Sequence, residues 1–189
     1  CITGYSCGDL FLQERLLEEA LDGLRTVVSH TKGYDALVFA GLPWEKDGKL
    51  YNVAAAVCNG ELLALVPKQN VPNYGEFYEL RYFSPGKGSV PDPPSTGLAK
   101  AGASVIVNLS ASNETVGKDE YRRKLLSAAS ARLMCGYVYA SAGEGESTQD
   151  LVFSGHNMIW ENGTLLAENG RFSQEAAVSE LDVSYLMRE

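Results

Sequence analysis

An amphipathic helical pattern followed directly by short apolar runs is the feature that most constrains what this chain can fold into. Apolar residues from Leu12 to Val28 recur at helical spacing, and Gly33 follows the segment. The next apolar runs have the length of strands, and two of them flank Asn59-Gly60, a sequence typical of a two-residue hairpin. The strands predicted in this part of the chain span residues 36–40, 51–58 and 61–66.

The rest of the chain continues the alternation of helices and strands. An apolar run at 104–109 predicts another buried strand, and the pattern at 118–134 predicts a second long helix. A short helix is predicted at 97–101, with further strands at 137–140, 151–154, 157–160 and 164–167 and a candidate strand at 177–181. These elements predict an α/β fold in which helices cover one face of a mixed sheet.

Length and charge limit the classes of function. With 189 residues, a single domain with one sizeable core is the expectation. The net charge of -8 argues against nucleic acid or an anionic membrane as the main partner, because both select basic surfaces. No apolar run reaches the length of a membrane span, and the first residues lack the basic start and apolar stretch of a signal peptide.

Cysteine and histidine usage gives no sign of a metal site or a disulfide framework. The four cysteines, Cys1, Cys7, Cys58 and Cys135, lack metal-ligand or disulfide spacing, and the two histidines lie far apart in the sequence. We therefore expect no bound metal. The same usage fits a protein of the reducing cytoplasm.

Lys68 is a candidate functional residue because it follows the predicted strand at 61–66. Glu76 and Glu79 come after it in a loop rich in proline, glycine and tyrosine. A lysine at a strand end, with carboxylates folding back on it, is a candidate oxyanion stabiliser or proton carrier. The alternative is an exposed lysine with both glutamates on a solvated face. Spacing alone favours that alternative, since structural ion pairs resemble functional ones.

A second group of small polar residues, Asn108-Leu109-Ser110-Ala111-Ser112-Asn113, overlaps the end of the predicted strand at 104–109. Sheet ends commonly host ligands, so these side chains could line a pocket. They could equally form an ordinary strand-to-helix loop in which Asn113 or Thr115 caps the helix. The pattern alone leaves the two interpretations even.

Several strings, taken together, resemble one family along nearly the whole chain. They are Cys1-Ile2-Thr3-Gly4-Tyr5, Gly41-Leu42-Pro43, Val66-Pro67-Lys68, Asn73-Tyr74-Gly75-Glu76-Phe77-Tyr78-Glu79, Asn108-Leu109-Ser110-Ala111-Ser112, Ala142-Gly143-Glu144-Gly145-Glu146-Ser147-Thr148 and Met158-Ile159-Trp160-Glu161-Asn162-Gly163. With these strings the chain resembles the glutamine-hydrolysing domain of glutamine-dependent NAD synthetase, in the nitrilase superfamily. The resemblance implies a nitrilase-type α-β-β-α sandwich, with mixed sheets covered by helices, as a single domain over residues 1–189.

The resemblance also implies a mechanism. The family uses a Glu-Lys-Cys triad, in which the glutamate is the general base, the lysine steadies the oxyanion and the cysteine attacks the side-chain amide of glutamine. Lys68 occupies the lysine position, and Glu76 matches a second glutamate that orients the site. Tyr74 and Ser112 match positions that help to hold glutamine. Lys118 falls where relatives can carry a basic residue near the substrate carboxylate.

The resemblance further implies the ligands of each domain. The α-ammonium group of glutamine needs a carboxylate partner, for which Glu76 and Glu79 are the candidates. The glutaminase domain itself is expected to need no cofactor. The synthetase domain of the family, which this sequence does not contain, would bind ATP, Mg and deamido-NAD. We also expect a homo-oligomer, with no nucleic acid or membrane as partner.

Two pieces of the family pattern are missing from this sequence. The triad glutamate of the family lies immediately before the string at Cys1, where this chain begins. The nucleophilic cysteine lies in a Cys-Glu-Asp elbow shortly before the Val90-Pro91-Asp92-Pro93-Pro94 segment, whereas here Gly88-Ser89 runs directly into Val90. An incomplete domain would explain this and predicts a break in the backbone near residues 88–90. The alternatives are an inactive nitrilase-like assembly domain and another nitrilase-type amidase, such as a carbamoylase.

Overall fold

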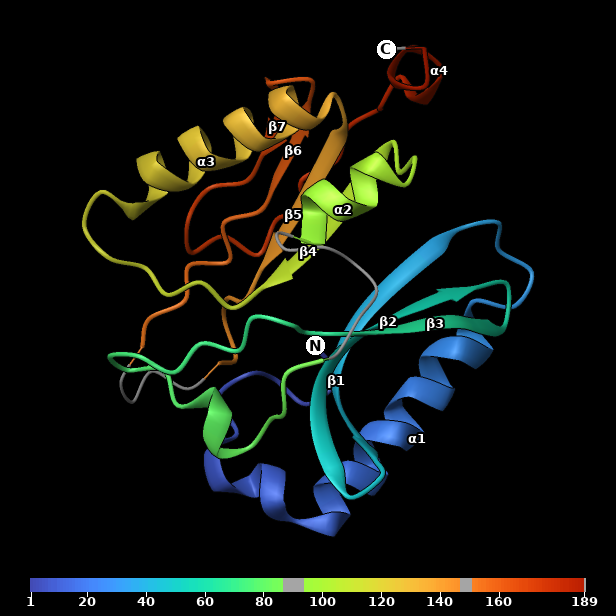
Figure 1. Cartoon of the computed structure of the whole chain (residues 1–189), viewed down its shortest axis with the longest axis vertical. Coiled ribbons are helices and arrows are strands. Elements are labelled where there is room, and N and C mark those ends of the chain that lie inside the picture. The colour runs from blue at the N-terminus through green and yellow to red at the C-terminus, as the bar shows by residue number, and fades with distance from the viewer. Residues whose placement is uncertain (87–93, 147–150, 189) are drawn as a thin grey trace. The chain divides into compact units, whose positions relative to one another are not determined.

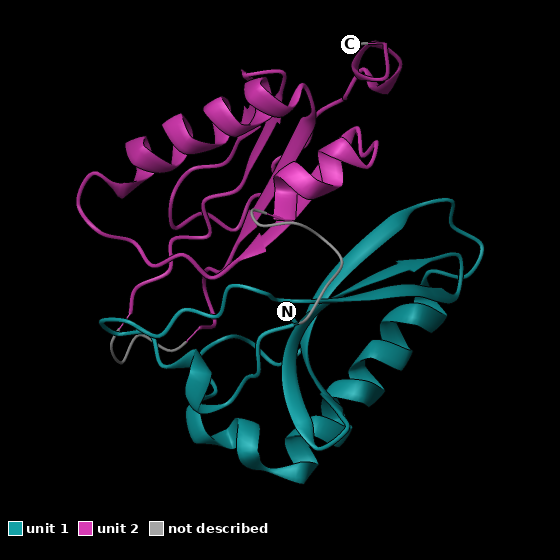
Figure 2. Cartoon of the chain, viewed as in Figure 1, with its two compact units in different colours: residues 1–88 teal, residues 89–189 magenta. Residues whose placement is uncertain are grey.

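A three-stranded antiparallel sheet and one long helix build the first of the two units into which the chain divides, residues 1–88 (Figure 2). The structure, a computed structural model, describes residues 1–86, 94–146 and 151–188. Figure 1 labels the long helix and the three strands of this unit. In chain order the elements are η1 (Gly8–Leu12), α1 (Glu14–His30), β1 (Leu37–Lys46), β2 (Lys49–Cys58), β3 (Glu61–Pro67) and η2 (Glu79–Arg81).

The apolar stripe of α1 packs against one face of this sheet. Leu24 of the helix is buried together with Leu42 of β1 and with Val53, Ala55 and Val57 of β2. The three β2 residues share a face because successive side chains of a strand point to opposite sides. The predicted long helix and its apolar face are therefore confirmed.

Two tight hairpins connect the three strands in sequence order. Asn59 and Gly60, between β2 and β3, both have positive φ, 46° and 80°. Asp47 and Gly48, between β1 and β2, have φ of 52° and 68°. A two-residue hairpin turn whose twist matches that of the flanking strands requires positive φ at both central residues. Asn-Gly and Asp-Gly adopt this conformation most readily. The Asn59-Gly60 hairpin was predicted from the sequence, whereas the Asp47-Gly48 hairpin was not.

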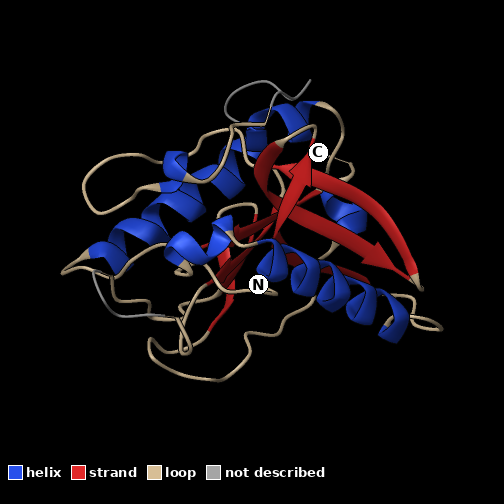
Figure 3. Cartoon of the chain, turned by 90° about the horizontal axis from the view of Figure 1, so that it is seen from below, coloured by secondary structure: helices blue, strands red, loops and turns tan. Residues whose placement is uncertain are grey.

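The second unit, residues 89–189, contains a four-stranded mixed sheet. β4 and β5 are parallel, and β6 and β7 continue the sheet in antiparallel order. Figures 1 and 3 show these strands and the helices of the unit. The elements are α2 (Pro94–Lys100), β4 (Val105–Ser110), α3 (Lys118–Leu133), β5 (Gly136–Ser141), β6 (Met158–Glu161), β7 (Thr164–Glu168) and α4 (Val183–Leu186).

The core of this unit lies between α3 and its sheet. Leu126 of α3 is buried with Ile106 of β4, Tyr137 and Tyr139 of β5 and Trp160 of β6. This arrangement confirms the predicted helix at 118–134 and the predicted strands at 104–109, 137–140, 157–160 and 164–167, with no end shifted by more than one residue. Among the described helices, none is both long enough and apolar enough to cross a bilayer.

Two predicted strands are wrong. Residues 151–154 form no strand, and two of their carbonyls accept from loops instead: Glu114 N–H donates to Val152 O, and Phe172 N–H donates to Ser154 O, both at 2.6 Å. Residues 177–181 are also irregular, and the short helix α4 follows them. The predicted backbone break at 88–90 lies outside the described residues.

Candidate active site

Lys68 extends from the end of β3 and forms an ion pair with Glu79. Its backbone N–H donates to the carbonyl of Asn52 on β2 at 2.8 Å, which continues the pairing of the two strands by one residue. Its Nζ donates to Glu79 Oε1 at 2.7 Å. The two side chains differ in exposure, at 37% for Lys68 and 6% for Glu79. The Glu79 side chain is therefore buried in the unit, while the Lys68 side chain is partly exposed to solvent.

Glu79 accepts hydrogen bonds from three segments that are far apart in sequence. Besides Lys68, the Tyr5 hydroxyl donates to Oε1 at 2.8 Å, and Asn52 Nδ2 donates to Oε2 at 3.4 Å. A buried carboxylate is tolerated when donors satisfy it in this way. Glu79 is the first residue of η2, and its N–H donates to Pro72 O at 3.3 Å.

The short helix η2 is fastened to η1 by the residues that follow Glu79. Arg81 Nε and the Tyr82 hydroxyl each donate to Asp9 Oδ1 at 2.9 Å. These hydrogen bonds, first from Arg81 and then from Tyr82, lower the pKa of Asp9. Behind them, the rings of Phe11 and Phe83 meet edge to face with centroids 4.9 Å apart. The backbone that carries Glu79 is thus tied to the N-terminal segment.

The structure places the two glutamates differently with respect to Lys68. From the sequence, Glu76 was expected to orient the site and Glu79 to bind substrate, and both were candidates for the α-ammonium of glutamine. The carboxylate placed at the Lys68 amine is that of Glu79, because η2 turns this residue inward, whereas Glu76 is exposed. Tyr74 is 70% exposed, with its ring edge to face against Phe77 at 5.5 Å. The structure thus pairs Lys68 with Glu79, and the functional roles expected for Glu76 and Glu79 stay predictions.

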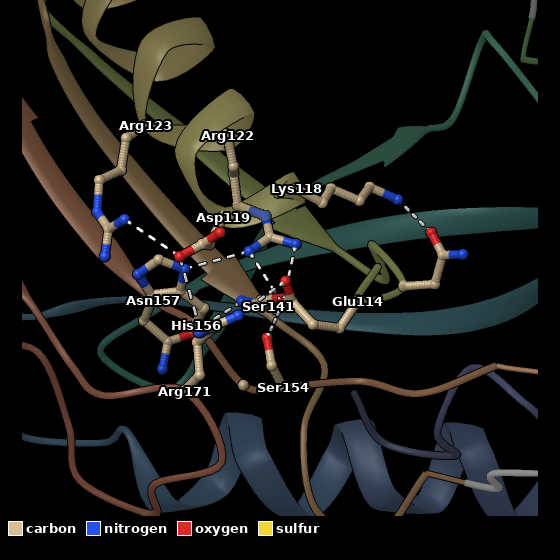
Figure 4. A network of polar contacts seen from close by, with 12 residues as sticks. Glu114, Lys118, Asp119, Arg122, Arg123, Ser141, Ser154, His156, Asn157 and Arg171 are labelled. Atoms are coloured by element: carbon tan, nitrogen blue, oxygen red, sulfur yellow. Dashed lines mark hydrogen bonds and ion pairs between the residues drawn. The ribbon is translucent and has the colours of Figure 1, made fainter. Parts of the chain in front are cut away.

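The other two predicted site residues belong to the second unit, where they flank a buried asparagine. Ser112 is half-buried in the loop after β4, and Lys118 begins α3. Lys118 Nζ donates to the side-chain oxygen of Asn113, which is buried (Figure 4). The N-cap of α3 is Gly117, with φ of 76°, so neither Asn113 nor Thr115 caps the helix as one interpretation expected.

Sequence reasoning missed a buried ionic network in the second unit, shown in Figure 4. Arg122 of α3 is almost fully buried and donates to Glu114 Oε2 at 3.3 Å. On its other side it lies 3.1 Å from Nδ1 of the buried His156, whose Nε2 lies 3.1 Å from Glu168 Oε2. Arg123 also donates to Glu168, at 2.9 Å. The only signal was that Arg122 shares a helical face with apolar residues.

Electrostatics within this network favours the ionised form of Glu168. Burial alone would raise the pKa of this carboxyl, but the hydrogen bonds from Arg123 and His156 outweigh burial and lower it. Among the described residues, no group of histidine, cysteine and carboxylate side chains is arranged to hold a metal ion. His156 is instead engaged with Arg122 and Glu168.

Comparison with known proteins identifies homologues of this chain. A glutamine-dependent NAD(+) synthetase from Mycobacterium tuberculosis is 37% identical over 228 residues, which cover 100% of this chain and 34% of that protein. The synthetase of Aquifex aeolicus is 29% identical, again over the whole chain and 36% of its own length. The chain is homologous to the N-terminal part of glutamine-dependent NAD(+) synthetases. It spans about a third of the length of these curated relatives. No family model matches it.

Solved structures agree with this assignment. The glutamine-dependent NAD(+) synthetase of Cytophaga hutchinsonii superposes with a TM-score of 0.84 and 28% identity, over 94% of this chain and 34% of that one. An amidase of the nitrilase superfamily from Nesterenkonia AN1 gives a TM-score of 0.73 at 20% identity, over 98% of this chain and 76% of that one, and shows the fold alone. The predicted nitrilase-type α/β fold is therefore confirmed.

The alignment with the Mycobacterium synthetase is also longer than the chain. It runs over 228 residues, against 189 in this sequence. The aligned part of that synthetase thus contains positions without a counterpart in this chain.

Proposed function

We propose that this chain is the glutamine-hydrolysing part of a glutamine-dependent NAD(+) synthetase. The observation that carries the proposal is the match of the entire chain, at 37% identity, to the N-terminal third of such a synthetase. In the proposed reaction a cysteine thiolate attacks the side-chain amide carbon of glutamine, the amide nitrogen leaves as ammonia, and water hydrolyses the thioester to glutamate. The cysteine and its general base are supplied by positions that this sequence does not contain.

Lys68 is proposed to stabilise the oxyanion that forms when the amide carbon becomes tetrahedral. An ammonium group has three donors, and Glu79 accepts from one of them. The partial exposure of the side chain gives a substrate oxygen access to the amine. A donor aimed at developing negative charge contributes roughly a hundredfold or more to the rate. Lys68 on the rim of a rigid hydrogen-bond cluster suits this task.

For substrate binding, we propose different roles for the two glutamates, Glu76 and Glu79. Glu79 is committed to Lys68, Tyr5 and Asn52, so it orients the amine. Glu76, whose side chain is exposed, stays our candidate for the α-ammonium of glutamine. Tyr74, Ser112 and Lys118 stay our candidates for the remaining glutamine contacts.

The ammonia is proposed to reach a synthetase domain that is not part of this sequence. There ATP, with Mg, would activate deamido-NAD for conversion to NAD, whereas the glutaminase part would need no cofactor. We further propose that the complete protein is a cytoplasmic homo-oligomer, with neither nucleic acid nor membrane as partner. An inactive assembly domain is the second candidate, favoured by the absence of a cysteine where Gly88-Ser89 meets Val90.

The test is an assay of the complete polypeptide that carries this sequence. We expect it to release glutamate from glutamine, and to form NAD from deamido-NAD and ATP with either glutamine or ammonium as nitrogen source. Hydrolysis of other amides or of N-carbamoyl compounds, but not of glutamine, would select the amidase alternative. NAD formation from ammonium alone would select the inactive domain.

A further inference from the structure

Tyr5 and Lys68 donate to the same oxygen atom of Glu79. The phenol reaches Oε1 at 2.8 Å and the ammonium reaches it at 2.7 Å, while the carboxylate is only 6% exposed. The pair Lys68–Glu79 is therefore part of a three-residue arrangement. Its third member lies in the string Cys1-Ile2-Thr3-Gly4-Tyr5, which the proposed reaction has so far left without a role.

The backbone around Tyr5 is fixed against the first sheet. Ile2 N–H donates to Gly41 O at 2.9 Å, next to β1 residues that pack under α1. Gly4 then turns the chain with φ of 83°, a conformation that favours glycine. The Cys7 thiol donates to Thr3 O at 3.1 Å and closes this turn. Hydrogen bonds on both sides of the turn thus hold the segment that carries the Tyr5 phenol.

A fixed donor at Oε1 limits how the Glu79 carboxylate can rotate. The flexible lysine side chain follows the oxygen to which it donates, so fixing Oε1 also fixes the ammonium. Asn52 holds the other oxygen more weakly, at 3.4 Å, and cannot replace the phenol on Oε1. Without the phenol, the carboxylate can turn toward the lysine and draw the amine away from its position.

We propose that Tyr5 is a positioning residue, whose hydroxyl holds Glu79 so that the Lys68 ammonium is aimed at the oxyanion. The proposal rests on the function proposed above. A displacement of the reacting geometry by about 1 Å can lower a rate by roughly a hundredfold. Loss of one hydroxyl that acts through two other side chains should have a smaller effect, mainly on kcat, because the interaction is realised in the transition state.

The experiment uses the complete polypeptide with Tyr5→Phe, and Tyr82→Phe as the matched control. Tyr82 also donates its hydroxyl to a carboxylate at 2.9 Å, but that carboxylate is Asp9, which does not pair with Lys68. We expect Tyr5→Phe to lower kcat for glutamine about tenfold, with KM within about twofold and the ammonium-driven rate unchanged. Tyr82→Phe should leave all of these values unchanged, because Arg81 still donates to Asp9 at 2.9 Å and keeps η2 connected to η1.

A double variant tests whether Tyr5 acts through Glu79. In the Glu79→Ala background, Tyr5→Phe should cause no further loss of kcat, because the oxygen it holds is gone. An additional loss in that background would overturn the proposal, as would a normal kcat for the single Tyr5→Phe variant.

A second measurement separates this proposal from the proposed function. Acetylation of Lys68, followed by mass spectrometry of its peptide, should be several-fold slower in Tyr5→Phe than in the unmodified protein or in Tyr82→Phe, because the carboxylate that turns toward the lysine pairs more closely with its ammonium. An unchanged acetylation rate would overturn the positioning role. If the unmodified enzyme fails to use glutamine, the proposed function fails, while the acetylation rate still decides whether Tyr5 holds the amine.

Discussion

The Lys68 ammonium and the Glu79 carboxylate meet at 2.7 Å, with most of the burial on the side of the glutamate. The two members of this pair differ. Tyr5 and Asn52 also donate to the Glu79 carboxylate and hold it in place, whereas the Lys68 side chain is partly exposed to solvent. This asymmetry is what an oxyanion-stabilising amine requires, since a donor must be held in place before the charge develops.

Replacing Lys68 tests its chemical role most directly. Lys68→Ala should lower glutamine-driven NAD formation by about a hundredfold or more, because the oxyanion loses a charged donor. NAD formation from added ammonium should stay normal in the same preparation. Lys46→Ala, which removes an exposed lysine at the end of β1, is the control and should change neither rate. Loss of both rates in Lys68→Ala would assign the lysine a structural role instead.

The two neighbouring glutamates should differ in their effect on stability. Glu79→Ala removes a buried acceptor, so the donors of Tyr5 and Asn52 lose their partner. We therefore expect the free energy of unfolding to fall by about 1–3 kcal/mol. Glu76→Ala, at an exposed position, should stay within about 0.5 kcal/mol. Urea unfolding followed by circular dichroism measures both. Equal effects would contradict the placement of Glu79 in the interior.

Adjacent arginines of α3 provide a second matched pair. Arg122→Ala leaves the Glu114 carboxylate buried without its main cation, and should destabilise the protein by about 3–5 kcal/mol. Arg123→Ala breaks ion pairs of a partly exposed side chain and should cost less than about 1 kcal/mol. Thermal or urea unfolding distinguishes them. If Arg122→Ala proved as mild as Arg123→Ala, the buried network would not contribute to the stability of this unit.

The lowered pKa of Glu168 predicts an acid-dependent term in stability. A carboxyl whose pKa is lower in the folded than in the unfolded state stabilises the fold above its unfolded pKa, and that stabilisation is lost as pH falls through the folded value. Glu168→Gln should therefore weaken the protein near neutral pH and reduce the stability lost on acidification. Urea midpoints between about pH 6 and about pH 3 provide the comparison. A parallel pH dependence in both proteins would rule this contribution out.

Loss of a substrate contact should raise the KM for glutamine. Tyr74→Phe and Ser112→Ala each remove one hydroxyl, and each should weaken glutamine use by about 1–3 kcal/mol, seen more in KM than in kcat if substrate and transition state are bound equally. Tyr34→Phe, which removes an exposed hydroxyl after α1, serves as the control. Normal glutamine kinetics in both test variants would remove these residues from the substrate site.

Local features were predictable because the interactions that produce them lie close together in sequence. The stripe of apolar residues produced α1, and Asn59-Gly60 produced the hairpin between β2 and β3 through positive φ at both positions. The place of Lys68 at the end of β3 followed from the apolar run before it. Residues 151–154 were assigned wrongly because an apolar run gives the tendency to extend but not the partner strand.

The sequence by itself determined the two long helices, most strands, the fold family and the candidate lysine. Only the tertiary structure decided that Glu79 rather than Glu76 is the buried partner of Lys68, and that Tyr5, 74 residues away, shares its oxygen. The same holds for Arg122, whose burial follows from Glu114 and His156 coming from other segments. Periodicity records which side chains one element can bury, whereas a charge becomes stable in the interior only when chain folding brings its partners to it.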